Sequence, residues 1–233
     1  LERTNIMELD ELSRVLPSVQ IQEQAVSLPS FNIRGVTDDT SSVSSTPRIS
    51  VYQDGFDISK KTVSSVSLYD IARVEVLKGP QPTLFGVAAA NGAISIHSQL
   101  PTDEKEMKVQ LGYDTQSGKE AEFMFNSPIN DNHSFRIAGL YREMDGIVEN
   151  NACSDDSYYG NANMTDHLGN SVSCNSEDLQ GVSVQAVRGT WKATYEQLEV
   201  IARASMEYND QPGIAFKSGS IAPNGGDTSP YTA

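Results

Sequence analysis

Few residues in this sequence are spaced for catalysis. The three histidines, His97, His133 and His167, lie far apart, and none belongs to the HExxH pattern of zinc proteases. The sequence contains no GxSxG nucleophile motif and no phosphate-binding glycine loop. It therefore offers no catalytic residue, and we expect a protein that is not an enzyme and needs no cofactor.

The densest group of potential metal ligands is the acidic segment 143–187. This segment has eight Asp and Glu residues and no Lys or Arg, and its asparagines add further oxygen donors. Calcium prefers about six to eight such oxygens, but the spacing here matches no EF-hand loop. We therefore predict a solvated acidic surface loop and no metal site.

The two cysteines, Cys153 and Cys174, fall in the same polar stretch. Neither has the close Cys or His neighbours of a zinc site. Two interpretations remain, a local disulfide in an oxidising compartment or two free thiols, and the first is favoured. Such a disulfide would stabilise the fold by roughly 3 kcal/mol.

Composition excludes several classes of protein. With 17 basic and 31 acidic residues the net charge is −14, which counts against nucleic-acid binding. A hydrophobic content of 38% is too high for a disordered chain, yet no apolar run is long enough for a transmembrane helix. The chain begins without the charged and apolar segments of a signal peptide, so we expect a mature or excised chain.

The first hundred residues combine one helical pattern with short strands. Residues 7–15 place apolar side chains near one helical face, and Pro17 ends the pattern. Gly, Pro, Ser and Asp clusters separate strand-like runs, which are 19–22, 31–34, 49–52, 74–77 and 94–97. This half is predicted to be a small α+β unit.

After Pro101 the pattern changes to long alternating strands. Polar and apolar residues alternate over 107–115, 119–128, 133–142, 182–194 and 198–208, with a phase slip near Ala186–Val187 that predicts a bulge. Connections alternate between tight turns (130–132, 195–197) and long excursions (146–180, 210–233). This is typical of an outer-membrane barrel, but a soluble antiparallel sheet with one face on a core also alternates.

Three sequence blocks identify a family resemblance. They are FNIRGV at 31–36, VYQDGF at 51–56 and DIARVEVLKGPQPTLFGVAAANGAISI at 70–96. Together they resemble the plug domain of the TonB-dependent outer-membrane receptors, and the stretch SPINDNHSFRIAG at 127–139 resembles the opening strands of that family's barrel. The implied domains are a plug at 1–100 and N-terminal barrel strands at 101–233. The fold class is then an α+β plug, with a small mixed sheet and short helices, followed by antiparallel strands of a transmembrane β-barrel.

The resemblance implies a transporter in the outer membrane of a Gram-negative bacterium, in contact with lipid. Its cargo would be a scarce, bulky nutrient, most often a ferric siderophore, with haem, cobalamin or glycans as alternatives. TonB would energise transport, although Leu1–Asn5 does not match the family's coupling segment, which we expect to be absent from this chain. Plugged barrels have about 22 strands, so five predict a piece of a longer receptor. A secreted adhesin or glycan-binding module is the competing hypothesis.

The resemblance also assigns site residues. Arg34 and Lys78, where the family usually has Arg, would anchor the plug against acidic residues of the barrel wall. Glu75 would do the same or pair within the plug. Ligand contact would fall on the loops 37–47 and 57–62, at Asp38, Asp39, Ser41, Ser42, Ile58, Ser59 and Lys60. The loop 146–180 would be extracellular, stiffened by a Cys153–Cys174 bridge.

Overall fold

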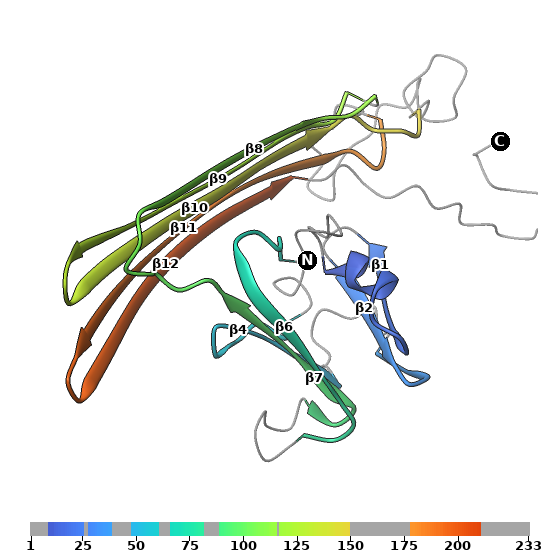
Figure 1. Cartoon of the computed structure of the whole chain (residues 1–233). Helices are drawn as coiled ribbons and strands as arrows, with labels where there is room; N and C mark the ends of the chain where they lie inside the picture. The colour runs from blue at the N-terminus through green and yellow to red at the C-terminus, as the bar shows by residue number, and fades with distance from the viewer. Residues whose placement is uncertain are drawn as a thin grey trace, which may run out of the picture.

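The computed structural model describes residues 9–25, 28–38, 48–60, 66–81, 89–115, 117–149 and 178–210. Its strands form three sheets, ordered β1-β2-β3, β5-β4-β7-β6 and β12-β11-β10-β9-β8. The third sheet curves over the first two, which lie on its concave side (Figure 1). Among the described residues, no helix is both long and apolar enough to cross a bilayer.

The first sheet and one helical turn pack together in the N-terminal part of the chain. The elements are η2 (Asp10–Arg14), β1 (Val19–Ala25), β2 (Leu28–Ile33) and β3 (Val36–Asp38). Arg34 and Gly35 have φ values of 54° and 81°, as the two-residue turn of a type I′ hairpin requires. Val19 and Ile21 of β1 are buried opposite Ile33 and Phe31 of β2. The alternation of the sequence thus turns one face of this sheet toward a core.

The second sheet, which we call the plug sheet, lies against that core. Its strands are β4 (Ile49–Gln53), β5 (Phe56–Asp57), β6 (Ile71–Lys78) and β7 (Gly92–Ser98). β4 and β7 are parallel and the other neighbours antiparallel, so the sheet is mixed, as predicted. Ile49, Val51, Ile94 and Ile96 are buried and pack in one cluster with the apolar face of the first sheet.

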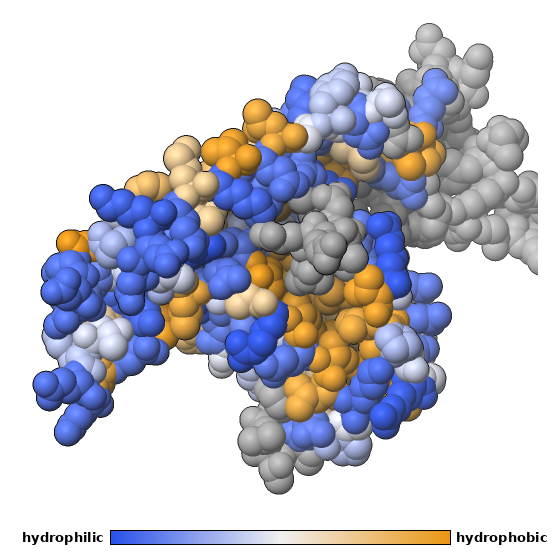
Figure 2. Space-filling view, viewed as in Figure 1, coloured by the Kyte–Doolittle hydropathy of each residue, from blue (hydrophilic) through white to orange (hydrophobic). Residues whose placement is uncertain are grey.

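The third sheet, which we call the wall sheet, is a row of consecutive antiparallel hairpins. Its strands are β8 (Glu106–Tyr113), β9 (Lys119–Asn130), β10 (His133–Met144), β11 (Val182–Tyr195) and β12 (Leu198–Asp210). β8 and β12 are its two edges, so it does not close within the described residues. Outward-facing apolar side chains such as Met107, Leu111 and Met206 are more than 70% exposed. Figure 2 shows orange side chains along its outer, convex side, over β8.

The helix predicted in the first hundred residues is longer than the one in the structure. Of the predicted helix, residues 9–15 are described and form the 3-10 helix Asp10–Arg14, and the described part of the chain contains no α-helix. Leu9 and Leu12, three positions apart, supply the buried side chains of this turn. A three-residue spacing suits a 3-10 helix, and Pro17 with the positive-φ Ser18 leaves no room for another turn.

The predicted bulge near Ala186–Val187 is wrong. β11 pairs with β10 from Val182 to Ala193 and with β12 from Ser183 to Tyr195, and neither pairing has a register shift. The apparent slip arises because apolar residues change sides along the strand. Val184 and Ala186 are buried toward the plug sheet, and the next inward position is occupied by Arg188.

Candidate functional site: the contact between the plug sheet and the wall sheet

The strongest contact between the two sheets is a two-pronged ion pair. Arg136 of β10 points inward, and its Nη2 and Nε lie 2.6 Å and 2.9 Å from the two carboxylate oxygens of Asp70. Asp70 directly precedes β6, and the two side chains are only 8% and 7% exposed. Bidentate pairs of this kind are among the strongest hydrogen-bonded contacts in proteins. Glu106 adds a second carboxylate 3.6 Å from the Arg136 Nη1.

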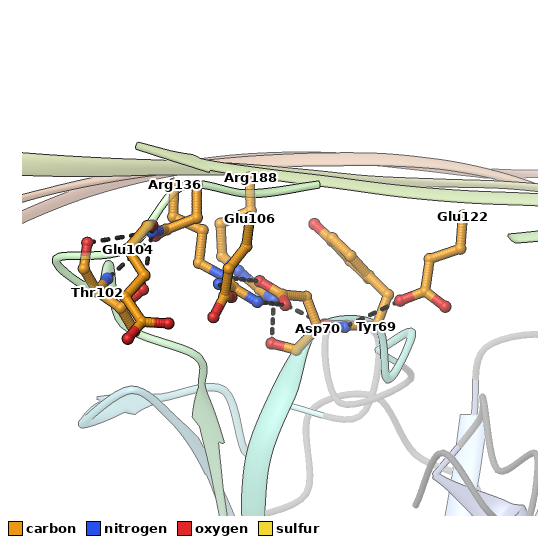
Figure 3. A network of polar contacts seen from close by, with 9 residues as sticks. Tyr69, Asp70, Thr102, Glu104, Glu106, Glu122, Arg136 and Arg188 are labelled. Carbon is orange, nitrogen blue, oxygen red and sulfur yellow. Dashed lines mark hydrogen bonds and ion pairs between the residues drawn. The ribbon is translucent and has the colours of Figure 1, made fainter. Parts of the chain in front are cut away.

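Arg188 holds the same segment by its backbone. Its Nη2 donates to the carbonyl oxygens of Tyr69, at 2.7 Å, and Asp70, at 3.0 Å (Figure 3). The guanidinium carbon lies 4.5 Å from the centroid of the Tyr69 ring, within range of a cation–π interaction. Tyr69 also packs on Leu140 and Val184 of the wall sheet. Burial raises the pKa of the Tyr69 phenol.

Two wall carboxylates accept hydrogen bonds from the same plug segment. The backbone N–H of Asp70 donates to the Glu122 Oε1 at 3.4 Å. The Ser67 hydroxyl donates to the Glu207 Oε1 at 2.9 Å, and the Ser67 N–H donates to the same atom at 3.3 Å. Segment 67–70 therefore meets cations and anions of the wall together, which fixes its position and orientation.

A second ion pair joins the hairpin of β4 and β5 to the edge strand β12. The Arg203 Nη1 lies 2.8 Å from the Asp54 Oδ2. Asp54 also accepts hydrogen bonds from the N–H and the hydroxyl of Ser98, at 2.8 Å and 2.7 Å. Arg136 and Arg203 flank Thr190 in one cross-strand row, so both arginines reach the plug sheet from the same height of the wall.

The connection between the two sheets is tied down by Asn126. Its side-chain amide donates to the backbone oxygens of Thr102, at 3.1 Å, and Glu104, at 2.5 Å, while its Oδ1 accepts from the Thr102 N–H at 3.0 Å. Asn126 is fully buried. The connection from β7 to β8 is therefore fixed to β9 at two of its residues.

The predicted anchoring residues are placed elsewhere in the described part of the molecule. Arg34 is exposed in the β2–β3 turn. Glu75 accepts a hydrogen bond from the Arg73 Nε at 2.5 Å, which lowers the pKa of the Glu75 carboxyl. Lys78 donates to the carbonyl oxygen of Pro17 at 2.7 Å. Within the described residues none of the three makes a hydrogen bond or ion pair with the wall sheet, and their anchoring role stays a prediction.

The predicted ligand residues are only partly described. Ser59 is buried, and its hydroxyl bonds to the backbone of Val51 and the carboxylate of Asp57. Ile58 packs against the core, Lys60 is exposed, and Asp38 ends β3. Ligand contact by these residues stays a prediction. The other predicted site residues lie outside the described residues; they are Asp39, Ser41, Ser42, Cys153 and Cys174.

Sequence reasoning did not select the residues that make the contact. These are Asp54, Ser67, Tyr69, Asp70, Arg136, Arg188 and Arg203. One signal was available, because Arg136, Arg188 and Arg203 all occupy the inward positions of strongly alternating strands. Arginine at such a position needs an anionic or carbonyl partner on the enclosed side.

The comparisons with known proteins agree with this arrangement. Residues 1–93 match the family model of the TonB-dependent Receptor Plug Domain. The pesticin receptor of Yersinia pestis is 30% identical over 154 residues, which are 65% of this chain and 22% of that protein. The ferripyoverdine receptor of Pseudomonas aeruginosa is 24% identical over 157 residues, 65% of this chain and 18% of that protein.

Solved structures show the same fold. The ferric yersiniabactin uptake receptor of Yersinia pestis superposes with a TM-score of 0.73 at 24% identity, covering 89% of this chain and 30% of that one. The pyoverdine outer-membrane receptor of Pseudomonas aeruginosa gives a TM-score of 0.66 at 15% identity, covering 88% and 26%. The chain thus spans about a fifth of the length of the curated relatives it matches. Residues 1–93 are therefore a plug domain of the TonB-dependent receptors of the Gram-negative outer membrane, and antiparallel strands follow it.

Proposed function

We propose that this chain is the plug and first wall strands of a receptor that imports a ferric siderophore with energy from TonB. Its relatives support this cargo class: their names include a ferripyoverdine receptor and a ferrichrome outer membrane transporter. A structural neighbour is described as a ferric yersiniabactin uptake receptor. In this proposal the plug domain comprises residues 1–100 and the wall strands begin at residue 101.

The buried contact of Asp70 with Arg136 and Arg188 carries the proposal. A plug that gates a pore must be held firmly and yet be releasable. Removing one partner of a buried ion pair leaves the other charge uncompensated at a cost of about 3–5 kcal/mol, so the closed arrangement depends on both partners. Water can solvate the charged groups of this contact once the plug moves. Mechanical work supplied through TonB can therefore break the contact, and the return of the plug to the wall sheet can restore it.

Growth assays test the cargo. The receptor that carries this sequence would be expressed in a Gram-negative strain lacking its own siderophore receptors, with and without TonB. Ferrichrome, ferripyoverdine and ferric yersiniabactin would be supplied singly as iron sources, beside haem. We expect growth on one ferric siderophore that requires both receptor and TonB. Growth on haem alone would show that the cargo is haem and not a ferric siderophore. Growth that is independent of the receptor on every source would reject the proposal.

We also propose that loop 146–180 is extracellular and contains a Cys153–Cys174 disulfide. The tight turns at 131–132 and 196–197 lie at the opposite end of the wall sheet, and outer-membrane strands have short turns on the periplasmic side. A thiol assay of the unreduced receptor, compared with a Cys153→Ser/Cys174→Ser variant, should find no difference. Two extra titratable thiols in the parent protein would reject the disulfide.

A further inference from the structure

The outward face of the wall sheet carries a hollow. A shallow groove of about 330 Å³ runs over β10, β11 and β12. Its outward-facing lining consists of small residues along the floor and larger apolar residues along the sides; these are Gly189, Ala202, Ala204, Phe135, Ile137 and Trp191. The volume lies at the lower end of the range of small-molecule sites.

Gly189 creates the hollow. It pairs with Ile137 on one side and Ala204 on the other, so a glycine and an alanine stand side by side on the outward face. A Cβ atom added to Gly189 would have no neighbour within 4 Å. The next cross-strand row continues the groove. Ala202 extends its floor, and Phe135 and Trp191 extend its side. The groove therefore runs along the strand direction.

An aromatic cluster with polar tips closes the groove toward the tight turns. The His133 ring stacks on Trp191 with centroids 5.3 Å apart and an interplanar angle of 22°. Tyr195 meets the same imidazole edge-on at 5.9 Å, and its hydroxyl lies 3.3 Å from the His133 Nε2. Tyr and Trp side chains of outer-membrane strands form such girdles at the interface between lipid and water. The polar end of the groove is thus at headgroup level.

The depth of the groove matches one leaflet. Gly189 precedes Tyr195, the last residue of β11, by six positions, or roughly 20 Å along a strand. At a strand tilt of about 40° this is roughly 15 Å of depth, slightly more than half of the apolar band of ~25 Å. The tight-turn end is periplasmic by the rule of short turns, and the periplasmic leaflet of an outer membrane consists of phospholipid.

We propose that this groove is a phospholipid site, in which one acyl chain of a periplasmic-leaflet phospholipid lies over Gly189 and Ala204 with its headgroup beside His133 and Tyr195. The site is continuous with the exposed apolar face of the wall sheet and needs no movement of the protein. An acyl chain fills the hollow with methylene groups, each of which stabilises the complex by burying apolar surface. The site is independent of the cargo and of TonB.

Native mass spectrometry of the detergent-purified full receptor tests the site, with 1-palmitoyl-2-oleoyl phosphatidylethanolamine as the probe. We expect a one-to-one lipid adduct that survives removal of the detergent. Gly189→Leu fills the floor, where an added Cβ meets nothing within 4 Å, and should weaken the apparent affinity roughly tenfold, equivalent to the contacts of about two methylene groups. Val187→Leu is the matched control, because Val187 is 44% exposed on the same face of β11 and outside the groove.

Ala204→Leu blocks the same floor from the neighbouring strand β12. It replaces Gly189→Leu in the test if the Gly189→Leu receptor does not assemble. Equal lipid binding by the parent, the filled variant and the control would overturn the proposal. So would binding of purified lipopolysaccharide with no binding of the phospholipid, because the occupant would then come from the other leaflet.

Discussion

The Asp70 carboxylate and the Arg136 guanidinium, 66 positions apart in sequence, meet through two hydrogen bonds while Asp70 holds a left-handed backbone, with φ at 49°. Asp54 repeats the relationship with Arg203, at φ of 53°. Aspartate is one of the few non-glycine residues that adopt a left-handed backbone in turns. In both contacts, then, a left-handed turn aims its carboxylate at the wall sheet, where an arginine binds it.

Asp70→Asn should loosen the plug in the full receptor. Asparagine tolerates the left-handed backbone and keeps the shape of the side chain, but the charge opposite Arg136 is lost. Leaving a buried arginine without its main partner costs up to about 3–5 kcal/mol. We expect higher sensitivity of cells to vancomycin, which is too large for ordinary porins, at equal receptor abundance in the outer membrane.

Asp103→Asn is the matched control, because Asp103 is an exposed aspartate in the connection between the plug sheet and the wall sheet. Its neutralisation should leave vancomycin sensitivity at the level of the parent receptor. Equal sensitivity of the Asp70→Asn and Asp103→Asn strains would show that the Asp70–Arg136 pair does not hold the plug closed.

The Asp54–Arg203 pair should behave as a coupled unit. In a double-mutant cycle of Asp54→Asn and Arg203→Gln, the second change should cost less once the first is made, with a coupling of about 0.5–3 kcal/mol. Hydrogen exchange of the Ser98 amide reports this directly, because that N–H donates to Asp54 at 2.8 Å. Strictly additive effects on the exchange rate would show that Asp54 and Arg203 act independently.

The pair of half-buried Lys192 and exposed Glu199 is the control for this cycle. Its atoms are 3.5 Å apart on the same sheet, and the Glu199 side chain is 48% exposed. Surface pairs contribute about 0–1 kcal/mol. Neutralising either residue should therefore leave the exchange of Ser98 unchanged.

The strands were predictable from the sequence because their causes are local. Turn residues such as Asp54 and Gly55 mark the hairpins, and the outward apolar face imposes a period of two on β8 and β12. The 3-10 turn was mistaken for a longer helix, since periodicity over nine residues does not separate the two. The supposed bulge in β11 reflects a change in which face is apolar, which depends on where the plug sheet touches the wall.

The contact residues could not be chosen in the same way. Asp70 belongs to a recognisable sequence block, but its partner Arg136 lies in another sheet, and no local pattern links them. Glu75 shows the opposite case: it pairs with Arg73, two positions away, so these two charges of β6 satisfy one another locally. The sequence shows which charges need partners, and only the topology decides which partners they meet.

Alkaline pH should release the Tyr69 contact. Burial raises the pKa of Tyr69 in the folded protein above that of the unfolded chain, about 10. A group with a raised folded pKa contributes stability that is complete below the unfolded pKa and is lost as the pH rises through the folded value. The difference absorbance at 295 nm between the parent receptor and Tyr69→Phe should show a phenol that ionises only above pH ~10. A midpoint at or below that value would mean that the ring is not buried against the wall.

Gly92→Ala should destabilise the plug, because a Cβ at Gly92 would lie 2.7 Å from the carbonyl oxygen of Leu77 and 3.1 Å from the Cδ1 of Ile33. The first neighbour is backbone in the adjacent strand and cannot rotate away, so β6 and β7 must separate. Overpacking of this kind costs about 1–3 kcal/mol. Gly189→Ala is the control, since its Cβ meets nothing within 4 Å. Amide exchange across β6 and β7 should accelerate in the first variant only; protection equal to that of the control would mean that the two strands have room for the methyl group.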